Sequence, residues 1–376
     1  MAEYLTNTTD LTKVATAIRE KGGTSDSLVY PDGFVTAIQA IQTGTELQII
    51  VSVTSGATVT ATKGSLSVSG TSVNGTCTLT VPEAGTWSVK ATLNVQTSDT
   101  KSVSVVDSYS LTLSFVSSTL NNNEWSVIKS VSDAGQGANY WSIGDRKEVT
   151  LNGTVGHLTL SNVTTYAFII GFNHNASVEG ANRIHFQLAK TALTGGTDVC
   201  LCDSSYNSKV STTGYFSMNR STTNSGGWKS SQMRTNICGT NLSSYSGTII
   251  AVIPAALRAV LKSVTKYTDN TGGRSTVASA VTATTDYFFL LSEYEVFGSI
   301  SYANSNESSK QAQYAYYSAG NSKIKYKHDG TSTAAVWWLR SPRASDTDTF
   351  VLVNTGGTVN RDNSYYSIGF APGFCV

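Results

Sequence analysis

The first apolar residues of the chain recur with the period of an α-helix. They fall at intervals of three and four residues: Leu11, Val14, Ala15 and Ile18. Thr9 or Asp10 can cap this helix and Gly22-Gly23 can end it, while Pro31-Asp32-Gly33 opens a second run that carries Phe34, Ile38 and Ile41. Residues 1–45 are therefore predicted to form two short helices. Such helices cannot cover their apolar faces alone, so we expect them to pack on a partner or on further copies of the chain.

The pattern then changes to that of short strands. Between residues 46 and 116, apolar residues alternate with polar ones in runs of a few residues, and turn signals follow at regular spacing. Asn74-Gly75 is a strong signal for a two-residue hairpin turn. Many short strands separated by turns predict a small β-sandwich, with Trp87 as its central aromatic residue.

Residues 117–376 carry mixed signals. Strand-like runs cover Tyr166–Phe172, Arg183–Leu188 and Phe350–Val353, and helix-like runs cover Ala255–Ser263 and Ser308–Ala319. Long loops rich in Ser, Asn and Gly separate them. The pattern predicts an α+β domain with much irregular structure, so the whole chain is expected to be an α+β multidomain protein.

Composition narrows the class of function. Only 14% of the residues are charged, well below the usual ~25%, and the net charge is +1. A nucleic-acid-binding face would need clustered basic residues, so we expect no nucleic-acid partner. We also expect no membrane insertion, because the sequence lacks a run of about 18 apolar residues. The N-terminus does not resemble a secretory signal, although the body of the chain has an extracellular composition, and virion proteins reconcile these two features.

Candidate catalytic and metal-binding residues are few. The five cysteines form no even framework, and buried free thiols are favoured over a metal site at Cys200 and Cys202. His174 and His185 lie at or within strand-like runs, where hydrogen-bonded structural roles are favoured over roles as ligand or base. Glu293 and Glu295 would share one face of a strand; ion pairing or capping is favoured over a glycosidase pair. We expect no enzyme activity, no metal and no cofactor.

Three segments resemble known protein families. The run "DLTKVATAIREKGGTSDSLVYPDGFVTAIQAI" resembles the N-terminal piece of tail proteins from phages and prophages of Gram-positive gut bacteria. The run from "SGATVTATKG" to "GTWSVKAT" resembles the immunoglobulin-like or carboxypeptidase-regulatory-like sandwich that follows it in such proteins. The blocks "EWSVIKSVSDAGQGANYWSIGD", "GFNHN", "LLSEYEVFG", "WWLRSP" and "GFAPGFCV" resemble a domain with the C-type-lectin fold that occurs in variable proteins of diversity-generating retroelements.

The resemblance implies three domains. Residues 1–45 would be a helical segment for virion attachment or oligomerisation, 46–116 an immunoglobulin-like β-sandwich, and 117–376 a C-type-lectin-fold binding domain with a variable region at about 339–370. In that family the C-terminal segment is rewritten by mutagenic reverse transcription at template adenines. The fold then presents the rewritten side chains to a ligand.

The composition of the C-terminal segment agrees with this implication. Asn codons mutated at either adenine can never encode Lys, Glu, Gln, Met or Trp. The chain holds 44 residues of these five types, yet none lies among residues 343–376. In a chain of uniform composition such a gap would arise roughly once in a hundred times. A diversified binding surface is favoured over an ordinary polar loop.

The candidate ligand-binding residues are the polar and aromatic positions of this segment. They are Arg343, Ala344, Ser345, Asp346, Asp348, Asn354, Thr355, Asn360, Arg361, Asp362, Ser364, Tyr365 and Tyr366. Tyr offers a large contact area at small entropic cost, and Ser, Asn and Arg add adaptable hydrogen bonds. Trp337 and Trp338 are expected to anchor the strands beneath the surface, with stacking on a sugar as the alternative.

The leading hypothesis is a bacteriophage tail protein, located in the virion, that binds a surface receptor of the host bacterium, either protein or glycan. Other tail proteins and further copies of the chain are its expected partners, with a trimer suggested by analogy to tail fibres. One alternative is a bacterial surface adhesin or display protein, which would need an export signal. A second is a tail-associated glycan hydrolase, which would need a fixed acidic or metal site.

Overall fold

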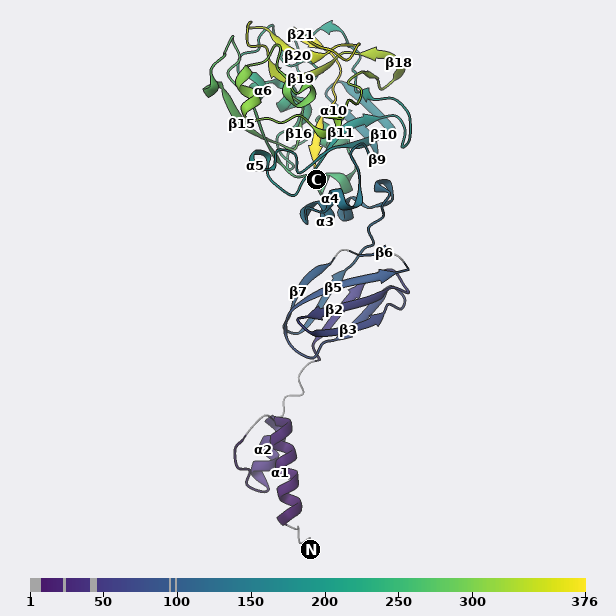
Figure 1. Ribbon diagram of the computed structural model, residues 1–376, viewed down its shortest axis with the longest axis vertical. Helices are drawn as coiled ribbons and strands as arrows, with labels where there is room; N and C mark the ends of the chain where they lie inside the picture. The colour runs from purple at the N-terminus through teal and green to yellow at the C-terminus, as the bar shows by residue number, and fades with distance from the viewer. Residues whose placement is uncertain (1–7, 23–24, 41–45, 95, 99) are drawn as a thin grey trace. The chain divides into compact units, whose positions relative to one another are not determined.

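The computed structural model describes residues 8–22, 25–40, 46–94, 96–98 and 100–376. Two compact units follow one another along the chain, Met1–Phe115 and Val116–Val376. The protein is mixed α and β, with many small sheets and short helices (Figure 1). No helix among the described residues combines the length and the apolar character needed to cross a bilayer.

The first unit opens with the two helices that the periodicity predicts. They are α1 (Thr8–Gly22) and α2 (Asp32–Ala40). They pack together through Ala15, Ile18 and Phe34, whereas Val14 and Ile38 are about half exposed. The two helices therefore cover part of each other, and the expectation of a further partner stays a prediction. Ile41 lies outside the described residues.

The rest of the first unit consists of two small sheets that share one hydrophobic core. Their strands are β1 (Gln48–Ser52), β2 (Thr58–Lys63), β3 (Leu66–Thr71), β4 (Thr76–Thr80), β5 (Gly85–Leu93), β6 (Gln96–Thr97), β7 (Lys101–Val105) and β8 (Ser108–Thr112). One sheet has the order β4-β1-β8; the other has the order β3-β2-β5-β6, with β7 also paired to β5. Trp87 is fully buried in the common core, as predicted.

The hairpin turn at Asn74-Gly75 is confirmed. Asn74 and Gly75 both have a positive φ, 51° and 84°, and Val73 exchanges two backbone hydrogen bonds with Thr76. Positive φ at both central residues is the requirement of a type I′ turn, which the Asn-Gly pair meets at low cost.

The second unit contains a five-stranded sheet. Its order is β16 (Phe288–Phe289), β23 (Gly373–Cys375), β11 (Ile184–Lys190), β10 (Leu158–Phe172) and β9 (Arg146–Val155). The central strand β11 is buried along its whole length. Its Phe186 stacks on Phe374, while His185 and Gln187 face the other way and contact the hydroxyl groups of Tyr314 and Tyr317. Strand β11 therefore buries the apolar Phe186 on one face and the polar His185 and Gln187 on the other, and His185 lies on a strand face as predicted.

Smaller sheets complete the second unit (Figure 1). They join β12 (Val199–Cys200), β17 (Lys325–Lys327) and β18 (Gly330–Ala335); β13 (Ser208–Lys209) and β22 (Tyr366–Ser367); β14 (Val264–Asp269) and β15 (Val281–Asp286); and β19 (Trp337–Pro342), β20 (Thr349–Val353) and β21 (Val359–Asn363). The β19-β20-β21 sheet is antiparallel. It carries most of the segment that the sequence marks as a binding surface.

The helices of the second unit are short. They are α3 (Trp125–Asp133), α4 (Gly137–Tyr140), α5 (Ala176–Glu179), α6 (Gly227–Ser230), α7 (Ile249–Val252), α8 (Ala255–Arg258), α9 (Glu293–Phe297) and α10 (Ala315–Ser318), with 3-10 turns η1 (Leu120–Asn122), η3 (Ala278–Ala280) and η4 (Ser305–Ser309) and a π-helical turn η2 (Met233–Cys238).

Two helix predictions were too long. The predicted helix Ala255–Ser263 ends at Arg258, because the chain then extends so that the Lys262 N–H donates to the Cys375 carbonyl. The predicted helix Ser308–Ala319 is split into η4 and α10 by an extended stretch that buries Tyr314. In both places tertiary pairing outweighs helical periodicity.

The prediction that Glu293 and Glu295 lie in a strand was wrong. Both lie in α9, whose capping box joins the Ser292 hydroxyl to the Glu295 N–H and the Glu295 carboxylate to the Ser292 N–H. The capping role that the sequence favoured is therefore present at Glu295. All five cysteines are free and buried, also as favoured.

Candidate functional site

The candidate surface rests on a buried frame. Every residue of β19 is buried, and so are residues 350–353 of β20 and residues 367–376 at the end of the chain. The indole N–H of Trp337 donates to the Lys323 carbonyl at 2.9 Å, and that of Trp338 to the Phe216 carbonyl at 3.0 Å. Because both rings are fully buried, they anchor the strands and are closed to stacking on a ligand.

Arg340, at the centre of β19, ties the frame to a buried charge network. Its guanidinium donates to both Glu295 oxygens, with Nη2 to Oε1 at 2.8 Å. Lys266 Nζ lies 3.0 Å from Glu295 Oε1 and 2.6 Å from Glu179 Oε2, and it also donates to the Tyr314 hydroxyl. Burial alone would raise the pKa of Glu295, but Arg340 and Lys266 outweigh it and hold that pKa below its usual range.

The same network contains a group of possible metal ligands. His174, Glu179 and Glu295 each offer one possible ligand atom, and these three atoms lie within 4.8 Å of one another. All three residues are buried. However, the Lys266 ammonium bridges the two carboxylates, and burial together with Lys266 lowers the pKa of His174 to about 3. The two glutamates are neutralised by Lys266 and Arg340, so the arrangement is that of a structural ion-pair network.

Twelve of the thirteen candidate binding residues keep at least part of their surface exposed. Ser345, Thr355 and Arg361 are the exposed ones, and nine are half-buried: Arg343, Ala344, Asp346, Asp348, Asn354, Asn360, Asp362, Tyr365 and Tyr366. Ser364 differs, because it is fully buried. Its hydroxyl donates to the Ser221 carbonyl and accepts from the Thr223 N–H, so Ser364 holds a neighbouring loop in place and does not belong to the exposed surface.

One aromatic ring outside the segment brings two of its arginines together. The guanidinium carbons of Arg343 and Arg361 lie 5.6 Å and 5.5 Å from the centre of the Tyr302 ring. The Tyr302 carbonyl also accepts from the Ala344 N–H at 2.9 Å. These contacts place the turn after β19 next to the edge strand β21.

Asp346 and Asn224 shape the turn between β19 and β20. The Asp346 carboxylate accepts from Arg343 at 2.8 Å and from the Thr349 hydroxyl at 2.6 Å. Burial alone would raise the pKa of Asp346, but these hydrogen bonds hold it below its usual range. The buried Asn224 amide donates to the carbonyls of Arg343, Asp346 and Thr349. Asp346 and Asn224 therefore fix the backbone of this turn.

Five further candidate residues lie in three places. Asp348 accepts from the Asn363 amide at 3.1 Å, which joins the ends of β20 and β21. Lys209 lies over the rings of Tyr365 and Tyr366, at 5.6 Å and 5.9 Å. Asn354 and Thr355 form the turn at the far end of the β20-β21 hairpin, roughly 13 Å along the strands. The segment thus presents one larger group of residues and one separate turn.

Sequence reasoning missed the residues that complete this surface. Tyr302, Lys209 and Asn224 lie far from the segment along the chain, and no local motif marks them. Only the glycine pair after Asn224 hints at an unusual backbone, because Gly226 and Gly227 both have a positive φ.

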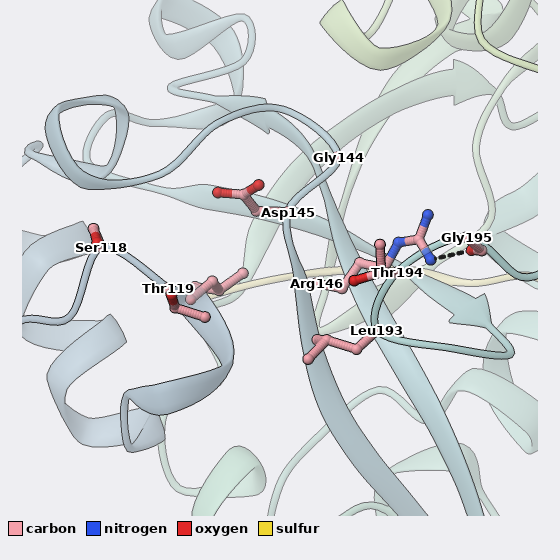
Figure 2. Close-up of a pocket in the computed structure, with 9 residues that line it drawn as sticks. Ser118, Thr119, Gly144, Asp145, Arg146, Leu193, Thr194 and Gly195 are labelled. Carbon is pink, nitrogen blue, oxygen red and sulfur yellow. Dashed lines mark hydrogen bonds between the residues drawn. The ribbon is translucent and has the colours of Figure 1, made fainter.

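A cavity near the start of the second unit is a competing site (Figure 2). It has a volume of about 410 Å³ and lies between residues 118–120, 144–146 and 193–195. The Arg146 guanidinium points toward Gly195 and donates to the carbonyls of Ala192 and Gly195 (Figure 2). The Asp145 carboxylate accepts from the Ser142 N–H. Its charged groups thus hold loops together, and none of the sequence-predicted residues lines it.

Comparison with known proteins shows that part of the second unit is similar to a family without a known function. Residues 204–376 match the family described as Domain of unknown function (DUF6273). No curated protein and no solved structure matches the chain. The matched region contains the frame, the β20-β21 hairpin and Tyr302.

Proposed function

We propose that the chain is a bacteriophage tail protein that binds a surface molecule of its host bacterium through the β20-β21 hairpin and its flanks. In this proposal the second unit is a C-type-lectin-fold domain, the two-sheet part of the first unit is an immunoglobulin-like spacer, and the helices attach the protein to the virion or to further copies.

One observation carries the proposal. The segment that lacks Lys, Glu, Gln, Met and Trp divides into a buried frame and a partly exposed polar surface. Val351 and Val353 are fully buried, whereas Arg361, paired with Val351 across the strands, is exposed. A recognition surface of changeable side chains needs such a division, because the exposed positions can differ without disturbing the core.

The exposed side chains also suit recognition. Tyrosines, arginines and short polar residues are enriched in surfaces that bind varied ligands. Near the frame, the charged side chains whose pKa values are shifted are held in ion pairs or hydrogen bonds. This arrangement supports a binding role over a catalytic one. The surface therefore fits a binding protein better than a glycan hydrolase.

Binding to whole bacteria tests the proposal. The fluorescently labelled full chain is applied to a panel of Gram-positive gut bacteria, and bound fluorescence is measured by flow cytometry. We expect saturable binding to at least one strain and a loss of about tenfold in affinity for Arg361→Ala. Lys90→Ala, an exposed cation of the first unit, is the matched control. The proposal fails if no strain is bound, or if Lys90→Ala and Arg361→Ala behave alike.

A further inference from the structure

A polar pocket lies beside the β21 end of the candidate surface. It has a volume of about 390 Å³ and is formed by residues of the 213–225 loop, α6 and the η2 turn. Volumes of roughly 300–1,000 Å³ are usual for small-ligand sites. The η2 turn is π-helical. Such turns are rare in proteins, and those that occur are often found at functional sites.

The pocket shares a wall with the candidate segment. The Asn363 amide donates to the Thr222 hydroxyl at 2.7 Å, and the Ser364 hydroxyl donates to the Ser221 carbonyl at 2.9 Å. The Ser364 carbonyl accepts from the Asn219 N–H. The loop that lines the pocket is therefore held directly against the end of β21.

The chemistry of the lining is uniform. Of the ten described residues that line the pocket, nine have uncharged hydroxyl or amide side chains, and the tenth is Arg220. Arg220, Ser221, Ser225 and Ser230 are exposed, and their side chains make no hydrogen bond or ion pair with other described residues. Their donors and acceptors are thus available to a ligand.

We infer that this pocket binds an anionic sugar residue, with Arg220 contacting its carboxylate or phosphate group and the surrounding hydroxyl and amide groups contacting its hydroxyls. Hydroxyl and amide groups both donate and accept, which matches a ligand with many hydroxyl groups. A guanidinium binds carboxylate and phosphate through paired hydrogen bonds. The inference rests on the proposed function, because it names the chemical class of the receptor that the candidate surface would bind.

Isothermal titration calorimetry on the full chain tests the inference. The probes are a galacturonic acid trimer, its methyl ester, and glucose 6-phosphate. We expect the trimer to bind at least about tenfold more tightly than the ester, which lacks the charges. Tighter binding of glucose 6-phosphate than of the trimer would assign the anionic group as a phosphate. Failure of both anionic probes to bind at millimolar concentration would overturn the inference.

Variants separate the pocket from general electrostatics. Arg220→Gln should reduce affinity for the trimer to that for the ester, whereas Lys90→Gln removes an equal charge in the first unit and should change nothing. Ser230→Tyr, which places a ring in the pocket, should abolish binding of either anionic probe. Unchanged affinity in Arg220→Gln or in Ser230→Tyr would contradict the assignment of this pocket.

The cell-binding measurement distinguishes the two proposals. If Arg220→Gln and Ser230→Tyr bind bacteria like the native chain while Arg361→Ala does not, the pocket inference fails and the proposed function stands. If the native chain binds the anionic probes through Arg220 but binds no bacterium, the proposed function fails and the pocket assignment stands.

Discussion

The guanidinium of Arg361 lies over the ring of Tyr302, with 5.5 Å between the guanidinium carbon and the ring centre. Arg343 contacts the same ring at 5.6 Å. Tyr302 therefore orders two arginines of the candidate surface, although it lies outside the segment that the composition marks. A cation–π contact at an exposed site contributes roughly 0.5–1 kcal/mol, and more when it is desolvated by a ligand.

Tyr302→Ala should weaken binding to bacteria about tenfold, because both guanidinium groups lose the ring that positions them. Tyr302→Phe should bind like the native chain, since the ring remains. Flow cytometry with labelled protein measures both affinities. Tyr109→Ala, at a tyrosine of the first unit that is 39% exposed, is the control. Equal binding by Tyr302→Ala and the native chain would show that Tyr302 has no part in recognition.

Asn224→Ala should destabilise the chain by about 1–3 kcal/mol, because three backbone carbonyls of the β19-β20 turn each lose one hydrogen bond. Urea denaturation measures this loss. Hydrogen exchange should also become faster at the amides of residues 343–349. Asn241→Ala, at an exposed asparagine, should cost less than about 1 kcal/mol. Unchanged exchange in the turn would mean that Asn224 does not fix it.

Arg340→Met should cost about 3–5 kcal/mol in the free energy of unfolding, because the buried Glu295 loses the partner that holds both of its oxygens. Denaturation at pH 7 measures the loss. Arg361→Met replaces an exposed arginine of the same sheet and should cost less than about 1 kcal/mol, the contribution of its contact with Tyr302. Similar costs for the two variants would refute the view that the network stabilises the frame.

Glu307 predicts a dependence of stability on pH. Burial raises its pKa from 4.5 to about 7, so the folded chain keeps the proton between these pH values while the unfolded chain releases it. The contribution of Glu307 to the free energy of unfolding therefore falls as the pH rises through this window. Glu307→Gln removes the titration. Relative to the native chain, this variant should gain up to about 3 kcal/mol between pH 4.5 and pH 7.5.

Urea denaturation of both proteins across this pH range gives the difference directly. His174 and Glu179 also titrate with a shifted pKa, but they are present in both proteins and cancel in the comparison. A difference in stability that stays constant with pH would show that the pKa of Glu307 is not raised.

Local signals in the sequence predicted local structure well. Asn74-Gly75 forms the predicted turn, and Trp87 lies in the core, because turn chemistry and strand alternation act over a few residues. The capping signal at Ser292 and Glu295 is equally local, but the alternation in the same run predicts a strand, and the structure follows the capping signal. Periodicity in a run this short does not distinguish a helix from a strand.

The candidate site could be predicted only in part. Composition marked the segment around β20 and β21, and most of its polar residues are at least partly exposed. Tyr302 and Asn224 contact this segment from distant parts of the chain, which no sequence pattern records. The burial of Ser364 has the same origin, since the 219–223 loop covers it.

The interior position of Ser364 has a consequence for sibling genes. If the segment is rewritten from copy to copy, its exposed positions can change freely, but a larger side chain at Ser364 would displace the loop that it holds. Copies with such a change would fold poorly and would disappear under selection. In a set of surviving copies, the residue at this position should therefore be small and unchanged, whereas the residues on either side of it differ from copy to copy.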